Sequence, residues 1–167
     1  YASRVNNNIM QSEHQCGNYP WETGTYKQTA PNDHAYGVES WGLMSKWIKD
    51  GVNSYLAWNM VLDSVGRSLD EVRPWAQNAL ITVNGSNYTL TPYYYVFRHF
   101  ANFVDPGAHR VDTSGSFSEV VAFENPDGSV VAVLYNSGAA RQMTLTGKGT
   151  TVSFSVPSNG WATVNLQ

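Results

Sequence analysis

Cysteine is almost missing from this sequence. Cys16 stands alone among 167 residues, so no disulfide can form within the chain, and cysteine usage does not reveal the redox compartment. Long apolar runs are missing too, since none approaches the roughly 18 residues that cross a bilayer. Residues 1–4 lack the apolar segment of a signal peptide. We therefore expect a soluble chain with no membrane span.

Neither sign of charge dominates. The 10 Lys and Arg and the 13 Asp and Glu give a formal net charge of −3, and the basic residues are scattered. They do not form a stripe that neutralises phosphates, so nucleic acid is not an expected partner. His14, Cys16 and His34 lack the spacing of a metal site, and we expect neither a metal nor another cofactor.

Aromatic residues, in contrast, are plentiful. The chain has six Trp and ten Tyr, many of them next to Asn, Gly or Ser in expected loops. Flat apolar rings stack well on the faces of sugar rings, although most of these rings suit an ordinary core equally well. The length of 167 residues allows one core or two small ones but falls short of the roughly 250 residues of a complete (β/α)₈ barrel.

Patterns in the first part of the chain, residues 1–107, predict two β/α units. A short strand is expected over residues 8–11, and Asp33 is suited to cap a helix whose apolar residues recur at helical spacing until Gly51. A β-prone run over residues 52–58 follows. Two strands joined by a single helix form a βαβ unit, so these strands are expected to be parallel.

A long loop is expected from Asn59 to Thr91. There, Thr91-Pro92 supplies a capping hydroxyl and a first-turn proline for a second helix, which ends before Asp105-Pro106-Gly107. The loop contains two glycosylation sequons, Asn84-Gly85-Ser86 and Asn87-Tyr88-Thr89, which decide no function. Two β/α units are too few to close a barrel or to cover a parallel sheet on both faces. Part of the sheet is therefore expected to lie outside this chain.

From residue 108 onward the pattern changes to alternating apolar and polar residues. Strands are predicted near residues 119–124, 129–135, 141–146, 151–156 and 161–166. Turn signals separate them, and Asn125-Pro126-Asp127-Gly128 is the strongest of these. The pattern predicts an antiparallel meander that forms a β-sandwich or half of one.

Glu13 follows the first predicted strand, within Gln11-Ser12-Glu13. Barrel enzymes carry their catalytic groups at the carboxyl ends of strands, because the strand fixes the backbone while the next loop shapes the pocket. The residues alone leave two interpretations open. One is a catalytic carboxylate; the other, which is commoner, is an exposed loop glutamate without such a role.

Several segments, taken in order, resemble glycoside hydrolase family 30, which includes glucosylceramidase-like enzymes, β-1,6-glucanases and glucuronoxylanases. Together the segments cover nearly the whole chain. They are Gln11-Ser12-Glu13, Ala57-Trp58-Asn59-Met60-Val61-Leu62-Asp63, Tyr93-Tyr94-Tyr95, His99-Phe100 with Phe103, Pro106-Gly107, Arg110-Val111, Ala122-Phe123 and Pro126-Asp127-Gly128-Ser129. Each segment is weak alone, and their order and spacing carry the resemblance.

The resemblance implies that Glu13 is the nucleophile on the seventh strand of a (β/α)₈ barrel in a retaining hydrolase. In this mechanism a second carboxyl group protonates the leaving oxygen. The family places that acid/base glutamate on the fourth strand, which has no counterpart in this chain, and neither Glu22 nor Glu39 matches it. Asp63 and Asp70 are better suited to binding or structure than to proton transfer.

The resemblance also places Trp58 on the floor of the substrate pocket, where an indole can stack against a sugar; core packing is the alternative. Aromatic and polar residues of the two loops are expected to form the pocket walls and to meet sugar hydroxyls. These residues are Tyr19, Trp21, Trp75, Gln77 and Asn78.

The patterns predict two β/α units in residues 1–107 and an antiparallel β-sandwich domain in residues 108–167, and the resemblance implies that the two units are the last two of a (β/α)₈ TIM barrel. The complete enzyme is expected to cleave an oligosaccharide, a polysaccharide or another β-glycoside with retention. A missing N-terminal barrel portion, on the same or a separate chain, would supply the acid/base, so this chain alone is expected to be inactive. The resemblance also implies secretion.

Two other functions remain open. The β domain and its aromatic residues are compatible with a carbohydrate-binding module that performs no catalysis. The whole chain is also compatible with a fragment that complements a separately made barrel portion. The loss of turnover on replacing Glu13 separates a hydrolase from a binder.

Overall fold

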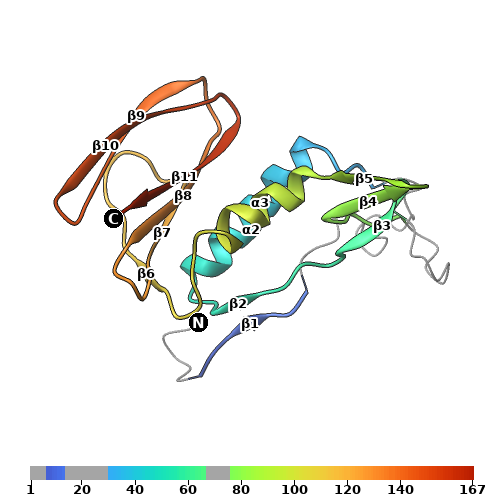
Figure 1. Ribbon diagram of the computed structural model, residues 1–167, viewed down its shortest axis with the longest axis horizontal. Coiled ribbons are helices and arrows are strands. Elements are labelled where there is room, and N and C mark those ends of the chain that lie inside the picture. Colours follow the sequence, from blue (N-terminus) through green and yellow to red (C-terminus); the bar gives the residue numbers. More distant parts are fainter. Residues whose placement is uncertain (1–6, 14–29, 67–75) are drawn as a thin grey trace. The chain divides into compact units, whose positions relative to one another are not determined.

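The computed structural model describes residues 7–13, 30–66 and 76–167 (Figure 1). The chain divides into two compact units, residues 1–96 and 97–167. Helix α3 (Pro92–Ala101) begins in the first unit and ends in the second.

Two short parallel strands open the first unit. Strand β1 (Met10–Gln11) pairs with β2 (Ser54–Tyr55). One further backbone hydrogen bond, from Leu56 N to Gln11 O at 3.0 Å, extends the ladder. The predicted parallel pairing is confirmed, although both strands are shorter than predicted.

Helix α2 (His34–Lys49) connects these strands. Asp33 caps its first turn, because Asp33 Oδ1 accepts a hydrogen bond from Tyr36 N at 3.0 Å. Gly51 follows the helix with a φ of 97°, in the left-handed region that favours glycine. Both predicted ends are confirmed. On its apolar face, Trp41 and Met44 are buried, Ile48 is half-buried and Trp47 is 42% exposed.

A small sheet lies between β2 and α3 in the chain, where the sequence pattern predicts only a long loop. Strand β3 (Val61–Asp63) is parallel to β4 (Ile81–Asn84), which pairs antiparallel with β5 (Asn87–Leu90). Gly85, with a φ of 60°, begins the two-residue turn of the β4–β5 hairpin. The loop prediction is therefore wrong. The turn residues are Gly85 and Ser86, and a Gly-Ser pair between two β-prone runs is a two-residue hairpin signal in the sequence.

Helix α3 begins as predicted. Thr91 Oγ1 accepts a hydrogen bond from Tyr94 N at 3.3 Å, and Pro92 occupies the first helical position. The ring of Tyr93 on α3 meets that of Tyr36 on α2 edge to face, with 5.3 Å between centroids. This contact packs the two helices of the first unit together.

Antiparallel strands form the main sheet of the second unit, in the order β11 (Gly160–Leu166), β8 (Val130–Asn136), β7 (Val120–Glu124) and β6 (His109–Val111). The chain leaves this sheet after β8, forms the hairpin of β9 (Arg141–Gly147) and β10 (Thr150–Val156), and returns as β11 (Figure 1). The predicted β-sandwich is confirmed. The simple meander is wrong, because β11 pairs with β8 rather than with β10, and β6 lies outside the predicted strands.

The main sheet of the second unit is covered on both faces. One face packs against the hairpin in a core of Val120, Ala122, Ala132, Leu134 and Val156, joined by Met143, Leu145 and Phe154. On the other face, Val121, Val131 and Val133 are also buried. There Phe123 meets Phe100 of α3 edge to face, with 6.2 Å between ring centroids.

The outer face of the β9–β10 hairpin is polar and uncharged. Its exposed side chains pair across the strands: Gln142 Nε2 donates to Ser155 Oγ at 2.6 Å, the hydroxyls of Thr144 and Ser153 lie 3.1 Å apart, and those of Thr146 and Thr151 lie 3.0 Å apart. These pairs alternate with the apolar core residues, as expected for strands with one solvated face.

His99 links the end of α3 to the main sheet. Its Nδ1 lies 2.8 Å from Thr163 Oγ1 on β11. Burial, with a smaller contribution from the neighbouring Arg98, lowers the pKa of His99 below its ordinary value of 6.5. The folded state therefore holds a proton on His99 less readily than the unfolded chain does. The stability that this side chain contributes is present above about pH 6.5 and is lost as the pH falls through the lowered pKa.

Replacing His99 by Gln should flatten the fall in unfolding free energy between roughly pH 7 and pH 5, because this position no longer takes up a proton on unfolding. Urea unfolding at several pH values, followed by circular dichroism, measures the slope. His109→Gln makes the same exchange at an exposed histidine on β6, away from this contact, and is the matched control. An unchanged slope in His99→Gln would contradict the lowered pKa of the half-buried His99.

Candidate active site at the strand ends

The carboxyl ends of β1 and β2 lie at one edge of their sheet, because the two strands are parallel. Gln11 ends β1 and Tyr55 ends β2, so Glu13 follows its strand by two residues and Trp58 follows its strand by three. The fold thus brings two of the predicted site residues to the same pair of strand ends.

Glu13 is exposed, and the strand before it holds its backbone. Glu13 N donates a hydrogen bond to Gln11 Oε1 at 2.8 Å, so the side chain of the last β1 residue closes the turn that presents the carboxylate. Gln11 thus holds the backbone of Glu13, a contact that its place in the Gln11-Ser12-Glu13 motif does not by itself reveal. The sequence signal for this contact is the place of Gln11 two residues before the glutamate. At this spacing a side chain can accept a hydrogen bond from a backbone N–H group.

Trp58 and Asn59 are joined by a cis peptide bond and are bound to a segment further along the chain. Gln77 Oε1 accepts hydrogen bonds from Trp58 Nε1 at 3.1 Å and from Asn59 Nδ2 at 2.9 Å. Backbone hydrogen bonds join Asn59 O to Leu80 N at 3.1 Å and Asn59 N to Asn78 O at 3.4 Å. The half-buried indole of Trp58 is therefore fixed at its N–H edge.

The segment that holds Trp58, residues 76–80, is buried throughout. Gln77 N donates to Gly66 O at 2.8 Å. Asn78 is 1% exposed, and its Nδ2 donates to Pro31 O at 2.8 Å. The segment thus ties the chain after β2 to the loop before α2. Asn78 is predicted to line the substrate pocket, and its contact with substrate stays a prediction.

Other candidates from the sequence lie outside the described residues, namely Tyr19, Trp21, Glu22, Asp70 and Trp75. Their roles stay predictions. Asp63, at the end of β3, accepts a hydrogen bond from Val65 N at 2.9 Å. This contact shapes the turn after the strand.

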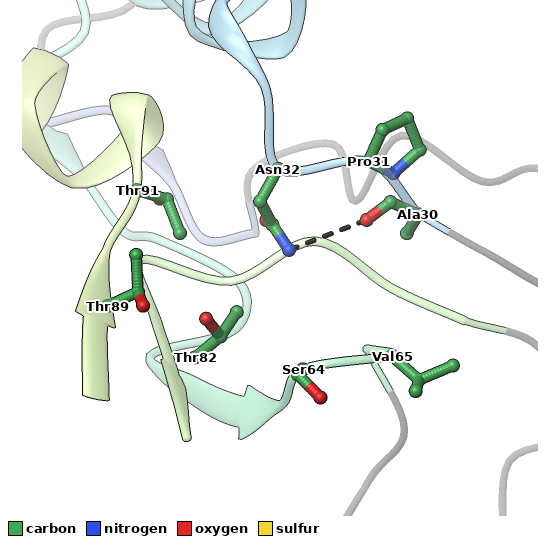
Figure 2. A pocket seen from close by; sticks show the side chains of 8 residues that line it. All are labelled: Ala30, Pro31, Asn32, Ser64, Val65, Thr82, Thr89 and Thr91. Atoms are coloured by element: carbon green, nitrogen blue, oxygen red, sulfur yellow. Dashed lines mark hydrogen bonds between the residues drawn. The ribbon is translucent and has the colours of Figure 1, made fainter. Parts of the chain in front are cut away.

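A hollow of about 290 Å³ lies elsewhere in the first unit, lined by Ala30, Pro31, Asn32, Ser64, Val65, Thr82, Thr89 and Thr91. Figure 2 shows its three threonines on one side and Asn32, whose Nδ2 donates to Ala30 O at 3.4 Å, on another. The lining offers hydroxyls and one amide but no carboxylate or imidazole. It therefore cannot supply the usual groups of general acid–base chemistry, and it contains none of the predicted site residues.

Within residues 7–13, 30–66 and 76–167, no three His, Cys, Asp or Glu side chains gather so as to hold a metal ion. The helices in this part of the chain are too short or too polar to span a membrane. The candidate site, as far as the structure describes it, consists of a carboxylate, an indole and amide groups.

Comparison with known proteins matches residues 107–164 to the family model described as the glycosyl hydrolase family 30 beta sandwich domain. The match begins at Gly107, which has a φ of 89° in the turn after α3, and ends within β11. It therefore includes both the main sheet and the hairpin.

Curated relatives are named as glycosidases. Putative glucosylceramidase 1 of Caenorhabditis elegans is 33% identical over 101 residues, which cover 55% of this chain and 19% of that protein. An endo-1,6-beta-D-glucanase of Aspergillus fumigatus is 37% identical over 65 residues, which cover 35% of this chain and 13% of that protein. The matched stretches thus span less than a fifth of either relative.

The fold also resembles a solved structure, SrfJ from Salmonella typhimurium, with a TM-score of 0.82 at 22% sequence identity. The likeness covers 99% of this chain and 36% of that one. The fold therefore recurs within a longer chain.

Close packing of Gly66 on the segment that holds Trp58 leads to a prediction. A Cβ at Gly66 would lie 2.2 Å from Gln77 O, and the φ of this glycine is 85°. Gly66→Ala should lower the unfolding free energy by roughly 3 kcal/mol or more, because left-handed strain and a backbone clash combine. Urea unfolding followed by tryptophan fluorescence measures the loss.

Two other glycines of the first unit separate the causes of that loss. Gly85 has a φ of 60° and open space where a Cβ would lie, so Gly85→Ala meets strain alone, about 1–2 kcal/mol. Gly42 lies within α2, also with open space, so Gly42→Ala should stabilise the protein by roughly 0.5–1 kcal/mol. If Gly66→Ala loses no more than Gly85→Ala, the close approach to Gln77 does not exist in solution.

Proposed function

We propose that this chain is the C-terminal part of a retaining β-glycoside hydrolase with Glu13 as its nucleophile, because residues 107–164 match the β-sandwich domain of glycoside hydrolase family 30. One observation carries the proposal: Glu13 and Trp58 follow adjacent parallel strands at their carboxyl ends. A carboxylate beside an aromatic platform is a suitable pair of groups for attack on a sugar. The relatives named as glycosidases support hydrolysis of a glycoside.

In this proposal, residues 1–107 are the last two β/α units of a (β/α)₈ barrel and residues 108–167 are the sandwich domain. Strand β1 and α2 form the seventh unit, β2 and α3 form the eighth, and the β3–β5 sheet is inserted in the eighth. Exposed apolar residues support a missing cover: Met10 is 59%, Leu56 46% and Met60 69% exposed. Parallel strands are normally covered on both faces, so we expect the N-terminal barrel portion, on the same or a separate chain, to cover them.

Glu13 acts in this proposal as a carboxylate that attacks the anomeric carbon. The bond from that carbon to the leaving oxygen breaks and a glycosyl ester forms, while a second carboxyl group about 5–5.5 Å away gives its proton to the leaving oxygen. The same group then takes a proton from water, whose oxygen attacks the anomeric carbon and releases Glu13. Two inversions retain the β configuration. The N-terminal barrel portion would supply this acid/base.

Trp58 forms the floor of the proposed pocket, with a face of its indole against the apolar face of the sugar. Gln77 engages the N–H edge of the ring rather than one of its faces. The proposed walls are Tyr19, Trp21, Trp75 and Asn78. The first loop has no basic cluster, which favours a neutral sugar within an oligosaccharide, a polysaccharide or another β-glycoside. Secretion belongs to the same proposal.

A carbohydrate-binding module without catalysis is the rival, and the sandwich does not favour it. Sheet faces that bind sugars use exposed aromatic rings, whereas the exposed face of the β9–β10 hairpin carries hydroxyl and amide groups. On the main sheet, the rings of Tyr135 and Trp161 pack against each other with 5.0 Å between centroids, and Tyr135 is buried. These aromatic residues support the domain from within.

Replacing Glu13 by Gln in the complete enzyme, with its N-terminal portion, should reduce kcat on an aryl β-glycoside by about 10³-fold or more, because the amide cannot form the glycosyl ester. Initial rates of aryl alcohol release measure the loss. Glu39→Gln, at an exposed glutamate on α2, is the matched control and should leave kcat unchanged.

Product stereochemistry tests the retaining mechanism separately. Proton NMR of the first product should show the β anomer before mutarotation. In Glu13→Gly with added azide, the small anion should attack in place of the carboxylate and give the α-glycosyl azide. Turnover by Glu13→Gln at the wild-type rate, or an α-configured first product from the wild-type enzyme, would refute the assignment.

A further inference from the structure

We infer that Gln77 is a positioning residue of the proposed active site, which holds the indole of Trp58 in the orientation that receives the sugar. The inference rests on the proposed function of Trp58 as the pocket floor. From its sequence, Gln77 is expected among the pocket walls. Its contacts indicate instead that it acts through Trp58.

The side-chain oxygen of Gln77 accepts hydrogen bonds from two consecutive residues. Gln77 Oε1 accepts from Trp58 Nε1 at 3.1 Å and from Asn59 Nδ2 at 2.9 Å. An amide oxygen has two lone pairs, so both are used. The same contacts fix the direction of the amide, because a flipped amide would turn its NH₂ group toward two other N–H donors. The oxygen must therefore face Trp58.

Gln77 is itself held firmly. The residue is 1% exposed, and its backbone N donates to Gly66 O at 2.8 Å. Gly66 approaches so closely that any Cβ there would clash with Gln77 O. Asn59 Nδ2, the second group that donates to Gln77 Oε1, also lies 3.3 Å from Asn78 O, and this contact fixes its position. The acceptor for the indole is thus part of a rigid frame.

The nitrogen of the Gln77 amide contributes nothing that the described residues show. Its Nε2 is buried and has no hydrogen-bond partner among these residues, and such a group is rare in folded proteins and lowers their stability. Fold stability alone therefore does not explain an amide at this position, whereas the two bonds to its oxygen do. An indole can turn about its Cβ–Cγ bond, and a hydrogen bond at Nε1 removes that freedom. A preorganised stacking platform needs this restriction.

Three substitutions in the complete enzyme test the inference. Gln77→Met removes the acceptor at similar volume, and Gln77→Glu keeps an acceptor oxygen in its place. Gln142→Met makes the same change on the exposed face of β9 and is the matched control. The first measurement is the indole ¹H–¹⁵N resonance of Trp58, identified by its loss in Trp58→Phe. The second measurement is of KM and kcat. Its substrate is the member of a panel of aryl β-glycosides that the wild-type enzyme hydrolyses fastest.

We expect the Trp58 resonance to move upfield in Gln77→Met and to return in Gln77→Glu, as the N–H group loses and regains its acceptor. KM should rise about tenfold in Gln77→Met while kcat stays within about twofold, because a misplaced platform weakens the binding of substrate and transition state alike. Gln77→Glu should restore KM, and Gln142→Met should change neither measurement.

A role in folding alone would lower the fraction of folded enzyme, and so reduce kcat at unchanged KM. That result overturns the inference, as does a Trp58 resonance that stays in place in Gln77→Met. If Gln77→Met does not fold, Gln77→Asn replaces it in the comparison with Gln77→Glu. The shorter Asn side chain moves the acceptor oxygen away from the indole by one methylene. The resonance does not depend on turnover. Full activity in Glu13→Gln would therefore refute the proposed nucleophile while leaving the contact between Gln77 and Trp58 separately measurable.

Discussion

Parallel hydrogen bonding between β1 and β2 is the constraint on which the proposed active site depends. Two strands can be parallel only if the chain crosses back between them, and α2 provides this crossover between the Asp33 cap and Gly51. Both strands then run in one direction, and the residues after each strand emerge at one edge. This backbone geometry is the reason that Glu13 and Trp58 follow neighbouring strand ends and can act on one substrate in the proposed site. The crossover helix is therefore as necessary to the site as the site residues themselves.

Local signals predict much of the frame around this pairing. Caps and turns act over a few residues, so the ends of α2 and most strands of the sandwich can be read from the sequence. The β3–β5 sheet cannot be read in the same way, because its strands have only three or four residues and β3 pairs with β4 across a long intervening stretch. The order of the sandwich strands fails for a related reason. Alternation shows that a strand has one buried face, but not which strand lies beside it.

The site shows the same division between local and distant signals. A rule about strand ends makes Glu13 a candidate, and the family resemblance adds its proposed role and that of Trp58. The same rule does not reach Gln77, which meets Trp58 from 19 residues further along the chain. A polar residue in an expected loop is naturally assigned to a pocket wall. Only the fold shows that this one is buried and turned toward the indole.

The uncharged outer face of the β9–β10 hairpin has a consequence for the solution conditions under which its cross-strand bonds persist. Its cross-strand pairs join hydroxyl and amide groups, which do not change protonation across the ordinary range of acidity. Dissolved salt weakens ion pairs by screening their charges, but it weakens neutral pairs such as these very little. The cross-strand bonding on this face of the hairpin therefore does not depend on acidity or ionic strength, unlike the bonding of a face made of ion pairs.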